Sequence, residues 1–248
     1  MRFVVQQIIN DRRSGKEQKY EEGTTDLLEI LIPNEFYKNN DELIIDEILS
    51  FFAAGVKTIH LSSTNLIWSM SKNPDMKEKL LAEVIPAVEA AKDDIANKLD
   101  YNTVMDFEYL HQCFYESLRM EPPFNISLQQ CFSRDVTMFD GLTIKKDTNF
   151  FVNIEAMHHD PTQWVEPSRY MPDRFDSGSK WFKKPDGENR NALTFNPFLG
   201  GKRGCLGKTF AEVVVRYTIP IIYYHMDLEV NDPNWEKPNF NINSSEPT

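Results

Sequence analysis

A glycine-rich loop in the last fifth of the chain carries the residues best suited to chemistry. The stretch PFLGGKRGCLGK, residues 197–208, sets Phe198, Gly201, Arg203, Cys205 and Gly207 in the spacing F-x-x-G-x-R-x-C-x-G. The apolar run after it predicts a helix, and a cysteine at a helix start is held as a thiolate by free N–H groups and the macrodipole. An ionised thiolate binds metal ions, so Cys205 is a candidate metal ligand.

The five positions together matter more than the cysteine alone. Taken alone, Cys205 would be interpreted as an inert, buried thiol in a turn, whereas a chance match to all five has a probability of about one in ten thousand. The loop resembles the haem-binding loop of the cytochrome P-450 family, the haem-thiolate monooxygenases. The resemblance implies that Cys205 is the axial ligand of a haem iron and that Arg203 pairs with a haem propionate. It further implies that Phe198 packs beside the sulfur, while Gly201 and Gly207 let the backbone approach the porphyrin.

A second pair of candidate residues lies upstream, in the sequence ESLR. Glu116 and Arg119 are one helical turn apart, close enough to pair, and by themselves would be a solvated surface pair. In order with the cysteine loop they resemble the E-x-x-R helix of the family, and PDRF, residues 172–175, resembles the element that supplies a further arginine, Arg174. The resemblance implies a buried structural triad of these three residues, which locks the segment before the cysteine loop.

A third match lies in AAGVKT, residues 53–58, within a long predicted helix. Ala54, Gly55 and Thr58 resemble the family's A-G-x-[D/E]-T, in which a small residue leaves room for oxygen and the threonine helps to deliver protons. The resemblance makes these three the candidate catalytic residues. Lys57 stands where the family has an acid, and by themselves a glycine and a threonine on a helix would only allow close packing.

Two smaller features are a pair of adjacent histidines and a group of lysines near the cysteine loop. The adjacent histidines of HHDP, residues 158–161, cannot readily reach the same metal ion, and the stretch resembles a short structural helix of the family. Four lysines lie near the thiolate loop in sequence: Lys183, Lys184, Lys202 and Lys208. They are either a solvated face or, by resemblance, a face that meets an acidic electron donor.

Composition excludes several classes of protein. A net charge of −11 argues against nucleic acid as a partner, because phosphate binding needs a basic surface. The three cysteines, Cys113, Cys131 and Cys205, form no CxxC pair, which speaks against a structural zinc site and a disulfide framework. No apolar run reaches the roughly 18–20 residues of a membrane span, and the start lacks the features of a signal peptide.

The elements expected to position these residues are mainly helical. Apolar spacing predicts helices over 1–11, 24–36, 41–72, 73–92, 106–121 and 205–225, with Asn73 as a cap. A polar loop is expected over 12–23. Alternation predicts short strands over 127–157, with a hairpin turn at FDGL, 139–142, and the aromatic but proline-rich segment 160–197 predicts an ordered meander. The tail from Asn231 is expected to be loosely structured.

These observations predict a mainly α fold with small β-sheets: the C-terminal portion of the cytochrome P-450 fold, with a long central helix and a haem-binding cysteine loop. Residues 1–248 are expected to be one partial domain that lacks the N-terminal half of the family domain. By resemblance, the eukaryotic microsomal type is favoured, which implies the cytosolic face of the endoplasmic reticulum membrane if the full-length protein carries an N-terminal anchor.

The function implied by the resemblance is that of a haem-thiolate monooxygenase. Such an enzyme inserts one oxygen atom from dioxygen into a small organic substrate, with electrons from an NADPH-dependent reductase. The apolar side chains of Phe51, Phe52, Ala53 and Ala54 suggest that the substrate is apolar. Three alternatives stay open. The chain could be a haem-thiolate enzyme that uses or rearranges a peroxide, a truncated non-catalytic haem-binding remnant (or else an incomplete gene model of a normal enzyme), or an α-rich domain without cofactor.

Overall fold

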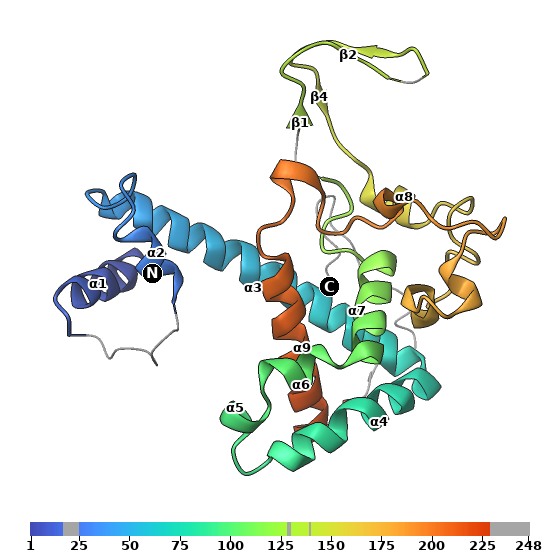
Figure 1. Ribbon diagram of the computed structural model, residues 1–248, viewed down its shortest axis with the longest axis horizontal. Coiled ribbons are helices and arrows are strands. Elements are labelled where there is room, and N and C mark those ends of the chain that lie inside the picture. The colour runs from blue at the N-terminus through green and yellow to red at the C-terminus, as the bar shows by residue number, and fades with distance from the viewer. Residues whose placement is uncertain (17–24, 128–129, 139, 229–248) are drawn as a thin grey trace. The chain divides into compact units, whose positions relative to one another are not determined.

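The computed structural model describes residues 1–16, 25–127, 130–138 and 140–228 (Figure 1). The predicted loop over 12–23 lies partly outside the described residues, as does Phe139 of the hairpin turn, and the predicted loose tail lies wholly outside them. The chain divides into two compact bodies, Met1–Lys57 and a second that begins at Thr58.

The first body is helical. It contains α1 (Arg2–Arg13), α2 (Leu27–Leu31) and the first part of α3 (Asp41–Lys72). Its core consists of Val5, Ile9, Leu28, Leu31, Ile44 and Ile45. The carboxylate of Asp26 accepts the Glu29 N–H at 2.9 Å and so caps α2. The helix is much shorter than the one predicted over 24–36, because Pro33 has no N–H with which to continue the hydrogen-bond ladder.

Two consecutive helices match their predicted extents. The helix α3 has 32 residues, about 48 Å at 1.5 Å per residue, and α4 (Pro74–Ala91) starts directly after it. Asn73 is the N-cap residue of α4, as predicted, with Pro74 in the first turn. Its side chain does not cap that helix, however, since it donates instead to the Ser69 carbonyl at 2.8 Å. Asn73 therefore closes α3 rather than opening α4.

The second body is built around three helices that pack on one another: α4, α7 (Glu108–Met120) and α9 (Lys208–His225). The short helix α5 (Ile95–Lys98) packs against α4, and α6 (Tyr101–Met105) against α9 (Figure 1). Buried side chains of all three main helices form one core, which includes Val84, Leu110, Phe114, Val215 and Ile219. This core carries α7 and the segment that precedes α9, where the candidate site lies.

Two small antiparallel ladders follow α7. Strand β1 (Gln130–Cys131) pairs with β4 (Asn149–Phe150), and β2 (Val136–Thr137) pairs with β3 (Thr143–Ile144). These confirm the predicted short strands. The strand prediction is wrong at its end, where residues 154–158 form the helix α8 (Ile154–His158). The Asn153 side chain accepts the Ala156 N–H at 2.9 Å and starts this helix.

The segment between α8 and α9 is an ordered meander, held by short 3-10 turns rather than by regular helices or strands. The turns are η1 (Pro172–Phe175), η2 (Lys180–Phe182), η3 (Ala192–Thr194) and η4 (Gly201–Arg203). The turn η1 packs on α7 and on η2. The meander thus reaches from the core helix α7 to the cysteine loop.

Candidate functional site

The helix α7 presents two charged side chains to the interior of the second body. A carboxylate from α4 fixes its N-terminal end: Glu83 accepts the N–H of Tyr109 at 2.8 Å and that of Leu110 at 2.9 Å. These are donors that a helix leaves unpaired at its start. At the other end, Glu116 and Arg119 lie one turn apart and are 0% exposed.

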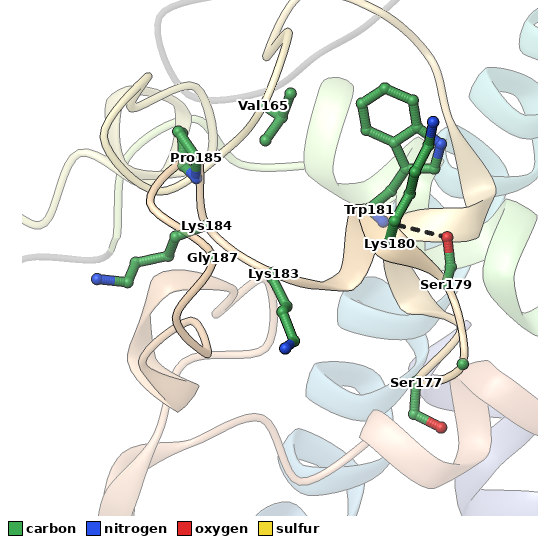
Figure 2. A pocket seen from close by; sticks show the side chains of 10 residues that line it. Val165, Ser177, Ser179, Lys180, Trp181, Lys183, Lys184, Pro185 and Gly187 are labelled. Carbon is green, nitrogen blue, oxygen red and sulfur yellow. Dashed lines mark hydrogen bonds between the residues drawn. The ribbon is translucent and has the colours of Figure 1, made fainter.

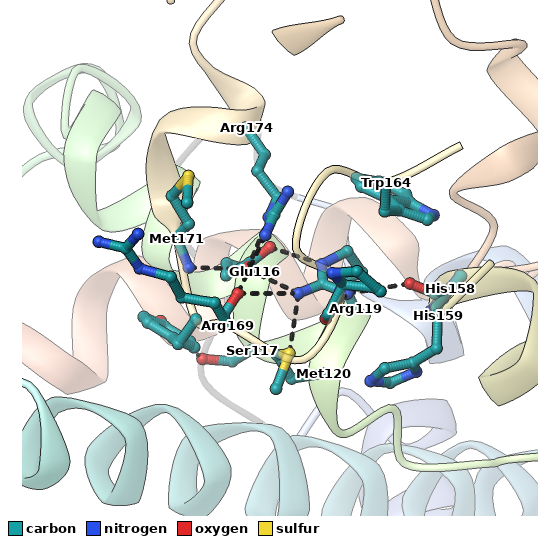
Figure 3. A network of polar contacts seen from close by, with 12 residues as sticks. Glu116, Ser117, Arg119, Met120, His158, His159, Trp164, Arg169, Met171 and Arg174 are labelled. Carbon is teal, nitrogen blue, oxygen red and sulfur yellow. Dashed lines mark hydrogen bonds and ion pairs between the residues drawn. The ribbon is translucent and has the colours of Figure 1, made fainter. Parts of the chain in front are cut away.

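The structure brings Glu116, Arg119 and Arg174 together in one buried cluster (Figure 3). Arg119 donates through Nε to Oε2 and through Nη2 to Oε1 of Glu116, both at 2.8 Å, in a bidentate contact. Arg174, from η1, donates through Nε to Glu116 Oε1 at 3.2 Å. The Met171 N–H donates to that oxygen as well, at 2.8 Å. One carboxylate therefore joins α7 to the meander.

One carboxylate leaves the cluster with a surplus positive charge, which backbone carbonyls compensate. Arg119 Nη1 donates to the carbonyls of His158 at 2.9 Å and Pro167 at 2.8 Å. Arg174 donates to the carbonyls of Val165, Glu166 and Arg169. Burial lowers the pKa of Arg174, while the charge of Glu116 raises it. Backbone carbonyls of the loop 165–169 therefore surround the two guanidinium groups.

Arg190 is a structural residue of the meander that the sequence analysis missed. Its guanidinium donates to the carbonyls of Trp181 at 3.0 Å, Lys183 at 3.3 Å and Arg174 at 2.6 Å. It also lies 4.4 Å from the centroid of the buried Trp164 ring. Burial first, then the charge of Arg174, lowers the pKa of Arg190 to about 10. An arginine alone between polar residues gives no sequence signal of this role.

The cysteine loop is held by its own backbone and by its connection to the meander. The Cys205 N–H donates to the Phe198 carbonyl at 2.8 Å, and the Gly204 N–H to the Gly201 carbonyl at 3.2 Å. Gly201 has φ +69°, a conformation that other side chains rarely adopt. A Cβ on Gly207 would lie 3.9 Å from Cys205 Sγ. The structure therefore gathers Phe198, Cys205 and Gly207 in one closed turn.

The Cys205 thiol lies at the surface, three residues before α9 begins at Lys208. The loop carbonyl of Phe198, and not the helix, therefore fixes its backbone. Two large apolar side chains close to it in sequence are also exposed, Leu206 by 82% and Phe210 by 63%. The guanidinium of Arg203 has no hydrogen-bond or ion-pair partner among the described residues. The loop thus offers a thiol, a cation and apolar surface together.

The other two cysteines have different surroundings. Cys113 is buried in α7, and burial raises the pKa of its thiol, which makes it inert. Cys131 is exposed but belongs to the ladder β1–β4, opposite Asn149. Of the three cysteines, Cys205 combines an exposed position with a glycine-rich turn that backbone hydrogen bonds close.

The candidate residues of α3 lie on neighbouring turns of that helix. Ala54 and Gly55 belong to the first body and Thr58 to the second. A Cβ built on Gly55 meets no atom within 4 Å. Ala54 and Lys57 are exposed, and Thr58 is half-buried. The structure thus leaves open space at Gly55 and presents Lys57 where a carboxylate was expected from the family pattern.

The meander also forms an open cavity of about 650 Å³ (Figure 2). Residues of 177–187 line most of it, with Lys184 and Trp181 on opposite sides in Figure 2. Lys184 is paired with Asp186 at 2.8 Å and Glu188 at 2.9 Å. The cavity therefore has less positive charge than its lysines suggest.

None of the described helices combines the length and the apolarity that crossing a membrane requires.

Comparisons with known proteins agree with this geometry. The chain is 32% identical over 195 residues to "Cytochrome P450 9c1" of Drosophila melanogaster, covering 75% of this chain and 35% of that protein. It is 31% identical over 239 residues to "(+)-vincadifformine 19-hydroxylase" of Catharanthus roseus, covering 91% of this chain and 42% of that protein. The chain thus spans well under half the length of these relatives.

A solved structure has a similar fold. The crystal structure of the cytochrome P450 CYP102L1 aligns with a TM-score of 0.79 at 22% identity, covering 98% of this chain and 53% of that one. The mainly helical fold with small sheets is therefore that of the matching part of a cytochrome P450. The sequence profile described as "Cytochrome P450" matches residues 2–244, which include the buried charge cluster and the cysteine loop, so this chain belongs to the cytochrome P450 family.

Proposed function

We propose that this chain supplies the haem-binding part of a haem-thiolate monooxygenase. The enzyme inserts one oxygen atom from dioxygen into an apolar organic substrate, with electrons from an NADPH-dependent reductase. The observation that carries the proposal is the exposed Cys205, whose backbone N–H donates to the Phe198 carbonyl inside the F-x-x-G-x-R-x-C-x-G turn. The name of the relative from Catharanthus roseus, (+)-vincadifformine 19-hydroxylase, supports an oxygen-inserting reaction.

The residues of the loop fit haem. Haem is a flat apolar ring with an iron centre and two anionic propionates, so it needs a thiolate, apolar contacts and a cation. Cys205 would ligate the iron, and Arg203 would pair with a propionate through charge-assisted hydrogen bonds. Leu206 and Phe210, exposed beside the thiol in sequence, would cover part of the ring. When bound, haem supplies the redox chemistry that activates dioxygen.

The remaining candidate residues have supporting roles in this proposal. Glu116, Arg119 and Arg174 hold the meander against α7 and so keep the cysteine loop in place. Ala54 and Gly55 leave room for oxygen beside α3, as the open space at Gly55 permits. By resemblance to the family pattern, the hydroxyl of Thr58 would help to deliver protons. The cytosolic face of the microsomal membrane is the proposed location if the full-length protein carries an N-terminal anchor.

The test is the carbon monoxide difference spectrum of the reduced, haem-supplemented protein, recorded on this chain and on any longer reading frame that contains it. We expect a strongly red-shifted Soret band that Cys205→Ala abolishes. The matched controls, Cys113→Ala and Cys131→Ala, should keep the band. A band that survives Cys205→Ala, or its absence from every form, contradicts the proposal.

A peroxide-using haem-thiolate enzyme is the second candidate. The observation that favours it is Lys57, exposed at the position of the usual acid, because a peroxide brings its own reduced oxygen and needs less proton delivery. Turnover driven by peroxide without reductase and NADPH would support this candidate. If Lys57 limits a reductase-driven reaction, Lys57→Asp should raise the fraction of consumed oxygen that appears in product.

A further inference from the structure

The side chain of His158 connects the helix α8 to the segment that carries the cysteine loop. It is 0% exposed, and its Nε2 accepts the backbone N–H of Asn196 at 3.0 Å. The His158 ring also packs on the ring of Phe195, the residue before Asn196, with 5.2 Å between the two ring centroids. Asn196 lies directly before the loop that begins at Pro197.

The imidazole is held in the state that this contact requires. Nε2 can accept the Asn196 N–H only when it carries no proton, so the neutral ring has its proton on Nδ1. Burial, followed by the charge of Arg119, lowers the pKa of His158 to about 3. The acceptor is therefore available throughout the ordinary pH range. Nδ1 has no hydrogen-bond partner among the described residues.

The same residue also contacts the buried charge cluster. The His158 carbonyl accepts Arg119 Nη1 at 2.9 Å, so one end of His158 is fixed by a guanidinium that Glu116 holds in turn (Figure 3). The carbonyl of Asn196 in turn accepts the Leu199 N–H at 3.1 Å. The Phe198 carbonyl then accepts the Cys205 N–H at 2.8 Å. Hydrogen bonds thus run from the charge cluster, through His158, to the thiol-bearing turn.

We propose that His158 is a positioning residue for Cys205: its Nε2 atom, by accepting the Asn196 N–H, sets the cysteine loop at a fixed place relative to the Glu116–Arg119 pair. The hydrogen bond between His158 and Asn196 does not depend on the proposed function. Only its consequence for haem ligation rests on the proposed function.

Three variants separate this role from simple packing. His158→Phe keeps a ring against Phe195 but has no acceptor. His158→Gln restores an acceptor, since the amide Oε1 is about as far from the backbone as Nε2. His159→Phe is the matched control, because the neighbouring imidazole has one hydrogen bond among the described residues, to the Glu155 carbonyl of α8 at 3.0 Å, and none to the cysteine loop.

The first readout is hydrogen exchange of the Asn196 amide in the haem-free protein, with amides of α7 as the internal reference for folding. Loss of one hydrogen bond should raise the exchange rate about tenfold in His158→Phe. His158→Gln should stay within a few-fold of the parent, and His159→Phe should be unchanged. Unchanged exchange in His158→Phe, or equally fast exchange in His158→Gln, would overturn the role of the acceptor.

The second readout is the red-shifted fraction of the carbon monoxide difference spectrum. We expect a smaller fraction in His158→Phe than in His158→Gln and His159→Phe, at a temperature where all remain folded. An unchanged fraction together with faster exchange would show that the contact does not position the thiol. If the parent protein shows no red-shifted band, the proposed function fails, whereas the exchange experiment still decides the role of His158.

Discussion

The buried charge cluster and the cysteine loop handle polar groups in opposite ways. In the cluster, the carboxylate of Glu116 and the guanidinium groups of Arg119 and Arg174 are fully buried and receive their partners from the chain itself. In the loop, the thiol of Cys205 and the guanidinium of Arg203 face outward. Burial demands partners, so the first region is self-contained and serves the fold. The second presents its functional groups to whatever the loop binds.

This contrast predicts that substitutions in the charge cluster lower the free energy of unfolding much more than substitutions in the cysteine loop. Glu116→Gln should lower the free energy of unfolding by about 3–5 kcal/mol, because it leaves two buried guanidinium groups without their carboxylate. Urea unfolding followed by tryptophan fluorescence measures this, since Trp164 is buried beside the cluster.

The matched control is Glu166→Gln, which removes an exposed partner of Arg169 at 3.2 Å. It should cost at most about 1 kcal/mol. If Glu116→Gln cannot be purified folded, Arg119→Lys, which keeps the charge and loses the bidentate contact, gives the comparison. Equal effects at Glu116 and Glu166 would remove the distinction between the two regions.

Substitution of Arg190 should lower the free energy of unfolding by an intermediate amount. Arg190→Gln leaves the carbonyls of Arg174, Trp181 and Lys183 short of donors, which should cost about 1–3 kcal/mol. The same urea titration measures it, with Arg134→Gln on the exposed hairpin as the control. A loss no larger than that of the control would mean that the meander is held by the triad alone.

The buried His158 and the partly buried His111 should make the second body labile to acid. Burial lowers the pKa of His158 to about 3 and that of His111 to about 4, where the charges of Arg216 and Lys208 also disfavour the protonated ring. The unfolded chain, with a pKa of about 6.5, takes up these protons first. Stability should therefore fall as the pH drops from about 6.5 towards 4, by about 1.4 kcal/mol per pH unit for each histidine.

Urea unfolding at several pH values between 4.5 and 8 checks this prediction. Above pH 7 the two histidines should contribute no slope. The double variant His111→Gln/His158→Gln should flatten the curve below pH 6.5. A slope that persists undiminished in the double variant would assign it to other groups.

The smallest effect on stability is expected in the loop itself. Arg203→Gln should change the free energy of unfolding of the haem-free protein by less than about 0.5 kcal/mol, because an exposed side chain without partners among the described residues is replaced. Haem affinity should fall about tenfold or more, since a charge-assisted contact to a propionate is lost. Lys202→Gln, the neighbouring cation, is the control, and equal losses of affinity in both would indicate a diffuse charge effect.

Much of the fold follows from local sequence patterns. The long helix over 41–72, the start of α4 at Pro74 and the short strands of 130–150 agree with the periodicity and the proline positions. The predictions were wrong where a local feature overrides the pattern. Pro33 cuts the second predicted helix short, and the Asn153 side chain starts α8 where strand was expected.

The residues of the candidate site divide in the same way. The spacing around Cys205 and the one-turn separation of Glu116 and Arg119 are properties of the sequence, because both depend on neighbours within about ten positions. The partnerships of Arg190 and His158 were decided by the tertiary structure. Their partners are backbone groups up to 38 positions away, such as the N–H of Asn196. A backbone N–H or carbonyl is the same in nearly every residue, so no residue type in the sequence marks it as a partner until the chain has folded.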